Sequence, residues 1–313
     1  MKLTGLLGVM LPLLALADPN NAWVTIRTED ADTGEPVSNL AVVAAFQIDN
    51  GTSKRKLSKR KDPEFALSYY FEQGIPISAA IEYILTMLNS NFEEWRMANP
   101  MAPVDDFKFT TNKMSASGAL FDLAKLEDVC RNVVSRMSAE EVYDEVLAWA
   151  QEYDPEFAGL ISRDPEYSKA ILSIGRGGKK PRKDFGQWNE VKAYLSFFFD
   201  ELFAPDYSGM PAQLAPETVK RILADYEAAY EPAEDADSWF AGVKALCPAY
   251  GFAADMKAYK AEPEAFAGSV ADLSMVLRVA VCGRTNAPDL YTVMTLLGAE
   301  KVKERLAAAR EAL

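Results

Sequence analysis

The residues best suited to phosphate chemistry are a run of cations near the start of the chain. Six of the eight residues from Lys54 to Lys61 are lysine or arginine, in a protein of formal net charge −13. Such a local excess of positive charge indicates a polyanion partner, either nucleotide phosphates or a nucleic-acid backbone. The alternative is a solvated basic loop, because short lysine and arginine runs are common.

A second basic cluster lies among glycines in the middle of the chain. Its cations are Arg176, Lys179, Lys180, Arg182 and Lys183, and its glycines are Gly175, Gly177 and Gly178. Glycine allows a close backbone approach and guanidinium groups suit phosphate geometry, so the cluster predicts contact with a nucleic-acid backbone. The alternative is an ordinary flexible, solvated loop.

A polar turn near the C-terminus has chemistry suited to RNA bases. Its residues are Gly283, Arg284, Thr285 and Asn286, followed by Ala287 and Pro288, between two expected helices. Arginine, asparagine and backbone groups recognise the edges of unstacked RNA bases. The turn therefore predicts an RNA-recognition loop, and a plain helix connection is the alternative.

Composition excludes several kinds of site. The chain has no histidine, which excludes a Ser-His-Asp triad, a Cys-His pair and a histidine-ligated metal. Cys130, Cys247 and Cys282 are far apart and lack CxxC spacing, so we expect buried thiols rather than a zinc site or disulfides. No metal site is predicted.

The expected secondary structure changes along the chain. Residues 1–19 resemble a secretory signal, with an apolar run too short for a transmembrane span, and residues 22–48 have the alternation of strands. From about residue 50 onward, apolar residues recur with helical period. The expected helices are Glu64–Gln73, Ser78–Leu88, Lys125–Arg136, Ala139–Glu152, Tyr167–Ile174, Gln187–Leu202, Pro216–Glu231, Trp239–Leu246, Val270–Val281, Asp289–Leu297 and Ala299–Ala312.

Two local features refine this reading of the helices. Ser138 and Glu141 have the spacing of a capping box at the start of one helix. The aromatic residues between Tyr194 and Phe203 have the spacing of a buried face on one helix, which we favour over base stacking.

Several motifs, taken in order, resemble one family. Lys56, Leu57, Ser58, Lys59 and Arg60 form KLSKR, which is similar to the KMSKS signature of class I aminoacyl-tRNA synthetases in its glutamyl form. The stretches that follow it in the family's order are Gly118–Asp122 with Lys125 and Leu126, Ile174–Asp184, Phe197–Phe203, Leu277–Thr285, and Leu297 with Gly298. Residues from about 46 to 313 thus resemble the C-terminal portion of bacterial-type glutamyl-tRNA synthetases.

The resemblance implies a mainly α fold. It predicts an unmatched, β-prone segment at 1–49, the KLSKR loop and stem-contact region at 50–137, and two helical anticodon-binding subdomains at 138–204 and 205–313. It also implies that the basic cluster contacts tRNA backbone and that the polar turn lies near the anticodon. In the intact family, the lysine matching Lys59 contacts ATP phosphates.

The implied activity is ligation of glutamate to tRNA with ATP and Mg²⁺, through an adenylate. Only about 50 residues precede the KLSKR loop and the chain has no histidine, so an HIGH-type catalytic half is absent. We interpret the chain as a truncated glutamate–tRNA ligase that is inactive alone and binds neither ATP nor Mg²⁺.

The expected partner is tRNA(Glu), and the sequence leaves tRNA(Gln) open as a second one. We expect no DNA or membrane partner, a monomer, and a cytoplasmic location despite the signal-like start. One alternative is a non-catalytic tRNA- or protein-binding module. Another, supported only by residues 1–48, is a secreted or surface protein.

Overall fold

The structure is a computed structural model that describes residues 46–49, 54–56, 67–114 and 119–313. These residues form two compact units. Unit 1 comprises the described residues up to Gly159 together with Lys179–Val191, and unit 2 comprises Leu160–Gly178 and Lys192–Leu313. The domain boundaries expected from the sequence stay predictions, because the two units interleave along the chain.

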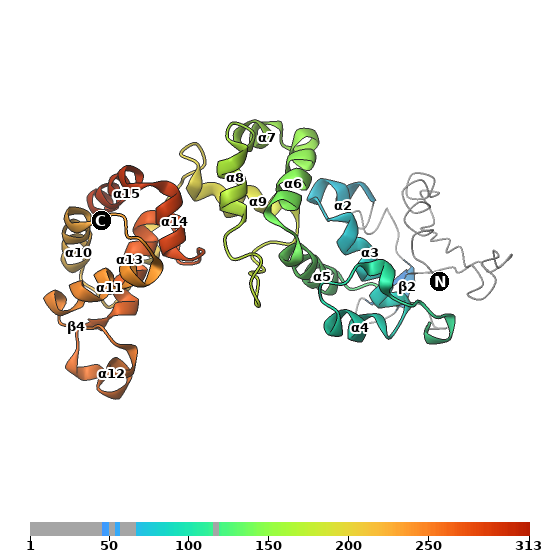
Figure 1. Cartoon of the computed structure of the whole chain (residues 1–313), viewed down its shortest axis with the longest axis horizontal. Coiled ribbons are helices and arrows are strands. Elements are labelled where there is room, and N and C mark those ends of the chain that lie inside the picture. The colour runs from blue at the N-terminus through green and yellow to red at the C-terminus, as the bar shows by residue number, and fades with distance from the viewer. Residues whose placement is uncertain (1–45, 50–53, 57–66, 115–118) are drawn as a thin grey trace. The chain divides into compact units, whose positions relative to one another are not determined.

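Helices dominate the described residues, as predicted (Figure 1). In unit 1 they are α2 (Leu67–Gln73), α3 (Ile77–Leu88), α4 (Phe92–Ala98), α5 (Leu123–Arg136) and α6 (Ala139–Tyr153). A small sheet accompanies them: β1 (Phe46–Asp49) pairs antiparallel with β2 (Lys54–Lys56) and parallel with β3 (Ala119–Leu120). The expected strand residues before Phe46 lie outside the described residues.

The core of unit 1 forms where α3 packs against α5. Ala79 and Tyr83 of α3 meet Leu126 and Cys130 of α5 in one buried cluster. Beside it, the carboxylate of Glu82 accepts a 2.6 Å hydrogen bond from Arg136 and forms a 2.9 Å ion pair with Arg96. Burial of this carboxylate is possible because both neighbours are cations.

The predicted capping box at the start of α6 is confirmed. The Ser138 hydroxyl accepts from the Glu141 amide at 3.1 Å, and the Glu141 carboxylate accepts from the Ser138 amide at 2.7 Å. Two otherwise unpaired amides are thereby satisfied at the helix start.

Unit 2 is a second helical body. The short helix α7 (Pro155–Ile161) and α9 (Trp188–Leu195) begin in unit 1 and end in unit 2. The helices that lie wholly in unit 2 are α8 (Pro165–Leu172), α10 (Pro216–Ala229), α11 (Ala236–Leu246), α12 (Met256–Ala261), α13 (Val270–Cys282), α14 (Leu290–Leu297) and α15 (Ala299–Ala312). A parallel strand pair, β4 (Phe252–Ala253) and β5 (Gly268–Ser269), precedes α13.

Helix α13 is the centre of unit 2. It packs against α10, α11 and α15, and Figure 1 shows it among them. Leu273, Val276 and Leu277 have no exposed surface. A helix that is apolar on most sides, as α13 is, has to be surrounded by other helices. Its C-terminal end is therefore held in a fixed place, and the polar turn begins there.

The expected helix at 187–202 is wrong at its C-terminal end. Helix α9 stops at Leu195 and a 3₁₀ turn, η4 (Ser196–Phe198), follows. Phe197, Phe198 and Phe199 are all buried, as expected, but not on one helix face. Three consecutive residues of an α-helix point about 100° apart, so burying all three favours a change of backbone path.

Other expectations have mixed outcomes. Cys130, Cys247 and Cys282 are buried free thiols, as predicted. The short helices α4, α7 and α12 were not predicted, because six or seven residues give too little periodicity to detect. Within the described parts of the chain, no helix has the length and apolar character needed to cross a membrane.

Candidate nucleic-acid interface

The polar turn, residues Gly283–Asn286, starts where α13 ends. Gly283 has a left-handed φ of 67°, and its amide donates to the Val279 carbonyl at 2.9 Å. A Cβ at this position would lie 2.6 Å from the Cα of Pro205, closer than real Cβ atoms come to backbone. The Asp206 amide donates to the Gly283 carbonyl at 3.0 Å. Glycine is therefore required here for both backbone conformation and close packing.

Arg284 points inward to its own unit. Its guanidinium donates to the Ala193 carbonyl at 2.9 Å and to the Ser196 hydroxyl, and it lies 4.9 Å from the centre of the Phe197 ring. Partial burial lowers the pKa of Arg284. These contacts fix the turn against the end of α9, so the side chain acts first as a support.

The other end of the polar turn is held by Arg278. This side chain donates to the carbonyls of Ala287 and Pro288 at 2.8 and 2.6 Å. Thr285 and Asn286 are exposed between these two anchored ends. Thr285 also has a close neighbour on its methyl side, since a Cβ on Gly209 would lie 2.5 Å from that methyl. The groups that the turn presents to solvent are thus a hydroxyl and an amide.

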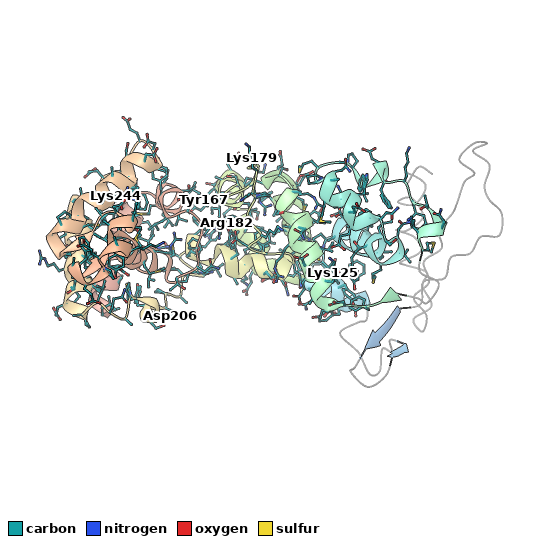
Figure 2. The ribbon with its side chains drawn as sticks, turned by 90° about the horizontal axis from the view of Figure 1, so that it is seen from below. Lys125, Tyr167, Lys179, Arg182, Asp206 and Lys244 are labelled. Carbon is teal, nitrogen blue, oxygen red and sulfur yellow. The ribbon has the colours of Figure 1, made fainter. Side chains whose placement is uncertain are left out.

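The basic segment, residues 176–183, is built differently. Arg176 donates from Nε to the Leu172 carbonyl at 2.7 Å, which closes the end of α8. Arg182 makes a two-pronged contact with the Asp184 carboxylate at 2.7 and 2.6 Å. Lys179, Lys180 and Lys183 are exposed (Figure 2 labels Lys179 and Arg182). The lysines therefore carry most of the charge that a phosphate could meet.

The KLSKR residues lie mostly beyond the described part of the chain. Lys56 is the last residue of β2, in register with Gln47 of β1. Leu57, Ser58, Lys59 and Arg60 lie outside the described residues, so their contact with ATP phosphates stays a prediction. Among the residues that the structure does describe, no group of three or more acidic or cysteine side chains could hold a metal ion.

Sequence reasoning missed the residues that hold the polar turn in place. Pro205 and Ser196 gave no signal, because their role depends on contact with residues about 80 to 90 positions later. Arg278 was part of a recognised stretch, but nothing in its sequence context indicated that it caps the carbonyls of Ala287 and Pro288.

Comparison with known proteins agrees with this geometry. The family described as anticodon binding domain matches residues 185–310. The glutamate–tRNA ligase of Clostridium perfringens (strain 13 / Type A) is 47% identical over 260 residues, 82% of this chain and 48% of that protein. The glutamate–tRNA ligase of Acetivibrio thermocellus is 45% identical over 261 residues, 83% of this chain and 47% of that protein.

A solved structure supports the fold. The glutamate tRNA ligase from Elizabethkingia meningosepticum, in complex with its amino acid, matches with a TM-score of 0.58 at 18% identity, covering 87% of this chain and 51% of that chain. At this identity the match concerns the fold alone.

The helical fold and the anticodon-binding match define the class as aminoacyl-tRNA synthetases. Within that class, the matched residues correspond to the C-terminal portion of the glutamate–tRNA ligase family, as the motifs predicted. The chain spans about half the length of the curated relatives that it matches.

Proposed function

We propose that this chain supplies the tRNA-binding portion of a glutamate–tRNA ligase, and that unit 2 binds the anticodon arm of tRNA(Glu). The observation that carries this proposal is the polar turn inside the anticodon-binding match. Its two ends are anchored by Gly283 and Arg278, and Thr285 and Asn286 are exposed between them.

The exposed groups suit recognition of an unstacked base. An asparagine amide both donates and accepts hydrogen bonds, and a threonine hydroxyl does the same, so together they distinguish one base edge from another. A turn that is already ordered loses little conformational entropy when RNA binds. Arg284 contributes by holding this geometry, through its bonds to Ala193 and Ser196.

The basic segment has a complementary role in this proposal. Lys179, Lys180 and Lys183 are exposed ammonium groups on a glycine-rich stretch. Ammonium groups act on phosphates as point charges, which strengthens binding without selecting a sequence. The segment thereby raises affinity for any tRNA, and the turn selects among them.

The catalytic side of the proposal rests on the resemblance. In a complete ligase, Lys59 would stabilise the charge that develops on ATP phosphates as the adenylate forms. ATP and Mg²⁺ would be the cofactors, tRNA(Gln) a second partner, and the cytoplasm the working compartment of a monomer. None of these steps involves a residue of the polar turn.

Titration of the purified chain with tRNA(Glu) transcripts tests the proposal. We expect tighter binding to the transcript with the native anticodon than to one with a changed anticodon, and we expect Asn286→Ala to reduce this preference. Asn112→Ala, an exposed asparagine of unit 1, is the matched control. Equal affinity for both transcripts would contradict the proposal.

A separate assay distinguishes the alternative of a non-catalytic module. Glutamate-dependent exchange between ATP and pyrophosphate reports formation of the adenylate. Binding of tRNA without exchange by the 313-residue chain would agree with a binding role for this portion. Exchange that depends on Lys59 would show that the chain itself performs the chemistry.

A further inference from the structure

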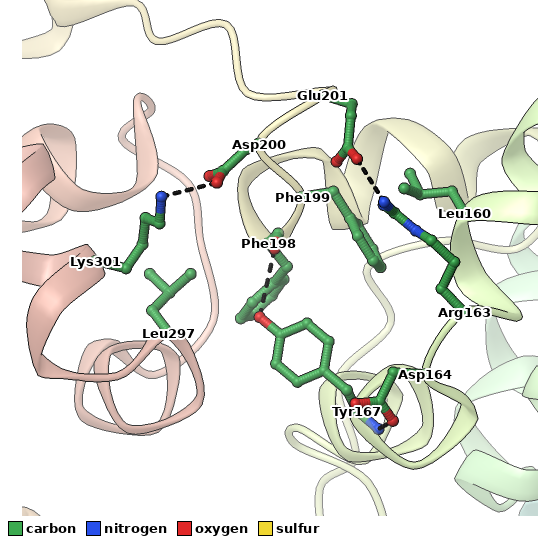
Figure 3. Close-up of a pocket in the computed structure, with 10 residues that line it drawn as sticks. All are labelled: Leu160, Arg163, Asp164, Tyr167, Phe198, Phe199, Asp200, Glu201, Leu297 and Lys301. Carbon is green, nitrogen blue, oxygen red and sulfur yellow. Dashed lines mark hydrogen bonds and ion pairs between the residues drawn. The ribbon is translucent and has the colours of Figure 1, made fainter.

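Unit 2 contains a pocket that the proposed function does not use. Its volume is about 360 Å³, and its apolar wall is formed by Leu160, Phe198, Phe199 and Leu297 (Figure 3). Tyr167 lies edge-on to the rings of both phenylalanines and donates its hydroxyl to the Phe198 carbonyl at 3.4 Å. The pocket is therefore an aromatic-walled hollow with a polar group inside it.

Two ion pairs lie at the polar side of this pocket. Arg163 contacts the Glu201 carboxylate at 2.7 Å, and Lys301 contacts the Asp200 carboxylate at 2.7 Å. The hydrogen bond from Arg163 lowers the pKa of Glu201, which keeps this carboxylate ionised. Each carboxylate has two oxygens and can accept further hydrogen bonds after its cation is paired. The polar side thus offers acceptors more than free positive charge.

Size and chemistry together select the kind of ligand. Ligand pockets begin at about 300 Å³, so this one has room for one small ring system with part of a sugar. An apolar, aromatic wall suits the face of a flat ring, and carboxylate acceptors suit an amine on its edge. A free phosphate suits the pocket poorly, because both lining cations are already paired.

The pocket is connected to the polar turn through unit 2. Arg284 of the turn lies over Phe197, whose ring centre is 4.5 Å from that of Phe198 in the pocket wall. The buried side chain of Arg305 makes a second connection. It donates to the Val281 carbonyl at 2.8 Å, just before the turn, and approaches Asp200 of the pocket at 3.7 Å.

Resting on the proposed function, we propose that this pocket binds one unstacked RNA base that carries an exocyclic amine. Cytosine, adenine and guanine each donate from such an amine to a carboxylate. Uracil places carbonyl oxygens on both sides of its ring N–H, and these face the carboxylates of Asp200 and Glu201 unfavourably. The pocket therefore prefers amine-bearing bases to uracil.

Nucleoside monophosphates test the pocket directly. We expect CMP, GMP and AMP to give saturation-transfer NMR signals with the full chain that exceed those of UMP at equal concentration. Leu297→Trp fills the pocket and should abolish these signals. Leu246→Trp, at a partly buried leucine on the end of α11, is the matched control and should leave them unchanged. Thermal unfolding of both variants verifies that they are folded.

A second variant tests the role of the carboxylates without filling the pocket. Glu201→Gln keeps the shape of the side chain but replaces one acceptor oxygen by a donor amide. We expect the preference for amine-bearing bases over UMP to fall at least twofold. Equal signals for all four nucleotides with the unaltered chain, or signals that survive Leu297→Trp, would overturn the proposal.

Titration with tRNA(Glu) transcripts separates the source of the base and the two proposals. A loss of about tenfold in affinity for Leu297→Trp alone would show that a tRNA base occupies the pocket. Unchanged tRNA affinity with loss of the CMP signal would assign the pocket to free nucleotides and overturn the tRNA source. If the chain binds no tRNA but the nucleotide signals persist, the proposed function fails and the pocket remains.

Discussion

The polar turn and the basic segment both combine glycines with cations, yet they are built in different ways. In the turn, Gly283 is packed against Pro205 and the guanidinium of Arg284 is bonded to its own unit. In the basic segment, the lysines are exposed and a Cβ added at Gly177 or Gly178 would meet nothing within 4 Å. The same residue types thus give an ordered recognition surface in one place and a loosely packed charged strand in the other.

This difference indicates how affinity and selectivity are divided. An ordered turn holds directional groups in fixed positions, which base recognition requires. A loosely packed strand of lysines needs no fixed geometry, because the attraction to phosphates depends little on direction. The following predictions test that division, beginning with the largest expected effect.

Replacing Gly283 by alanine should destabilise the protein by about 2–4 kcal/mol. The left-handed φ of 67° strains a side chain, and the new Cβ would collide with the backbone of Pro205. Gly177→Ala is the control, because it has a similar φ of 72° but open space around it, and should cost about 1 kcal/mol. Urea unfolding measures both, and equal losses would contradict the packing argument.

Replacing Lys179, Lys180 and Lys183 together by glutamine should weaken tRNA binding about 10- to 100-fold at low salt. The logarithmic salt dependence should fall by about 2, since roughly 0.7–0.9 counterions are released per phosphate contact. The loss should be the same for transcripts with native and changed anticodons.

Arg182→Gln provides an internal comparison for the lysine variant. Its guanidinium is already bonded to Asp184, so removing its charge should change the salt dependence less than removing any one lysine does. Titrations at two salt concentrations measure this. A lysine variant with an unchanged salt dependence would remove the phosphate role of the basic segment.

Asn286→Ala should reduce discrimination between anticodons by about 1–2 kcal/mol without loss of stability, because its side chain is exposed. Arg284→Ala should differ, since it breaks bonds to Ala193 and Ser196 and so lowers stability as well. Paired titrations and unfolding curves separate the two effects. Equal losses of affinity for both transcripts in Asn286→Ala would leave the anticodon role resting on resemblance alone.

The smallest expected effect concerns pH at the base of the polar turn. Burial raises the pKa of the Cys282 thiol from 9.0 to about 11, although Arg278 and Arg305 nearby favour the thiolate. Because the folded pKa is the higher one, its stabilising contribution is complete below pH 9 and is lost as pH rises from 9 to about 11. At pH 10 the loss should be about 1 kcal/mol.

Cys282→Ala is the variant that checks this expectation. It should show a shallower fall in the free energy of unfolding between pH 9 and 11 than the unaltered chain, because the titrating thiol is gone. Equal slopes for the two proteins would show that Cys282 does not contribute to the pH dependence.

Much of the helical architecture follows from local patterns. Helix α15 has the bounds expected from its periodicity, and α6 begins at the expected capping box. Both depend on residues three or four positions apart, which sequence reasoning can compare directly. The three basic or polar candidate regions were also found this way, because composition shows where cations, glycines and amides gather.

The direction in which those candidate side chains point depends on contacts between distant residues. Arg284 was expected to face RNA, but its partners Ala193 and Ser196 are 91 and 88 positions earlier in the chain. Helix α9 ends at Leu195 because Phe197, Phe198 and Phe199 are buried by surrounding elements, which no local pattern indicates. Residue type and periodicity therefore predicted the helices and the chemistry available, whereas packing between distant segments determined which groups are exposed.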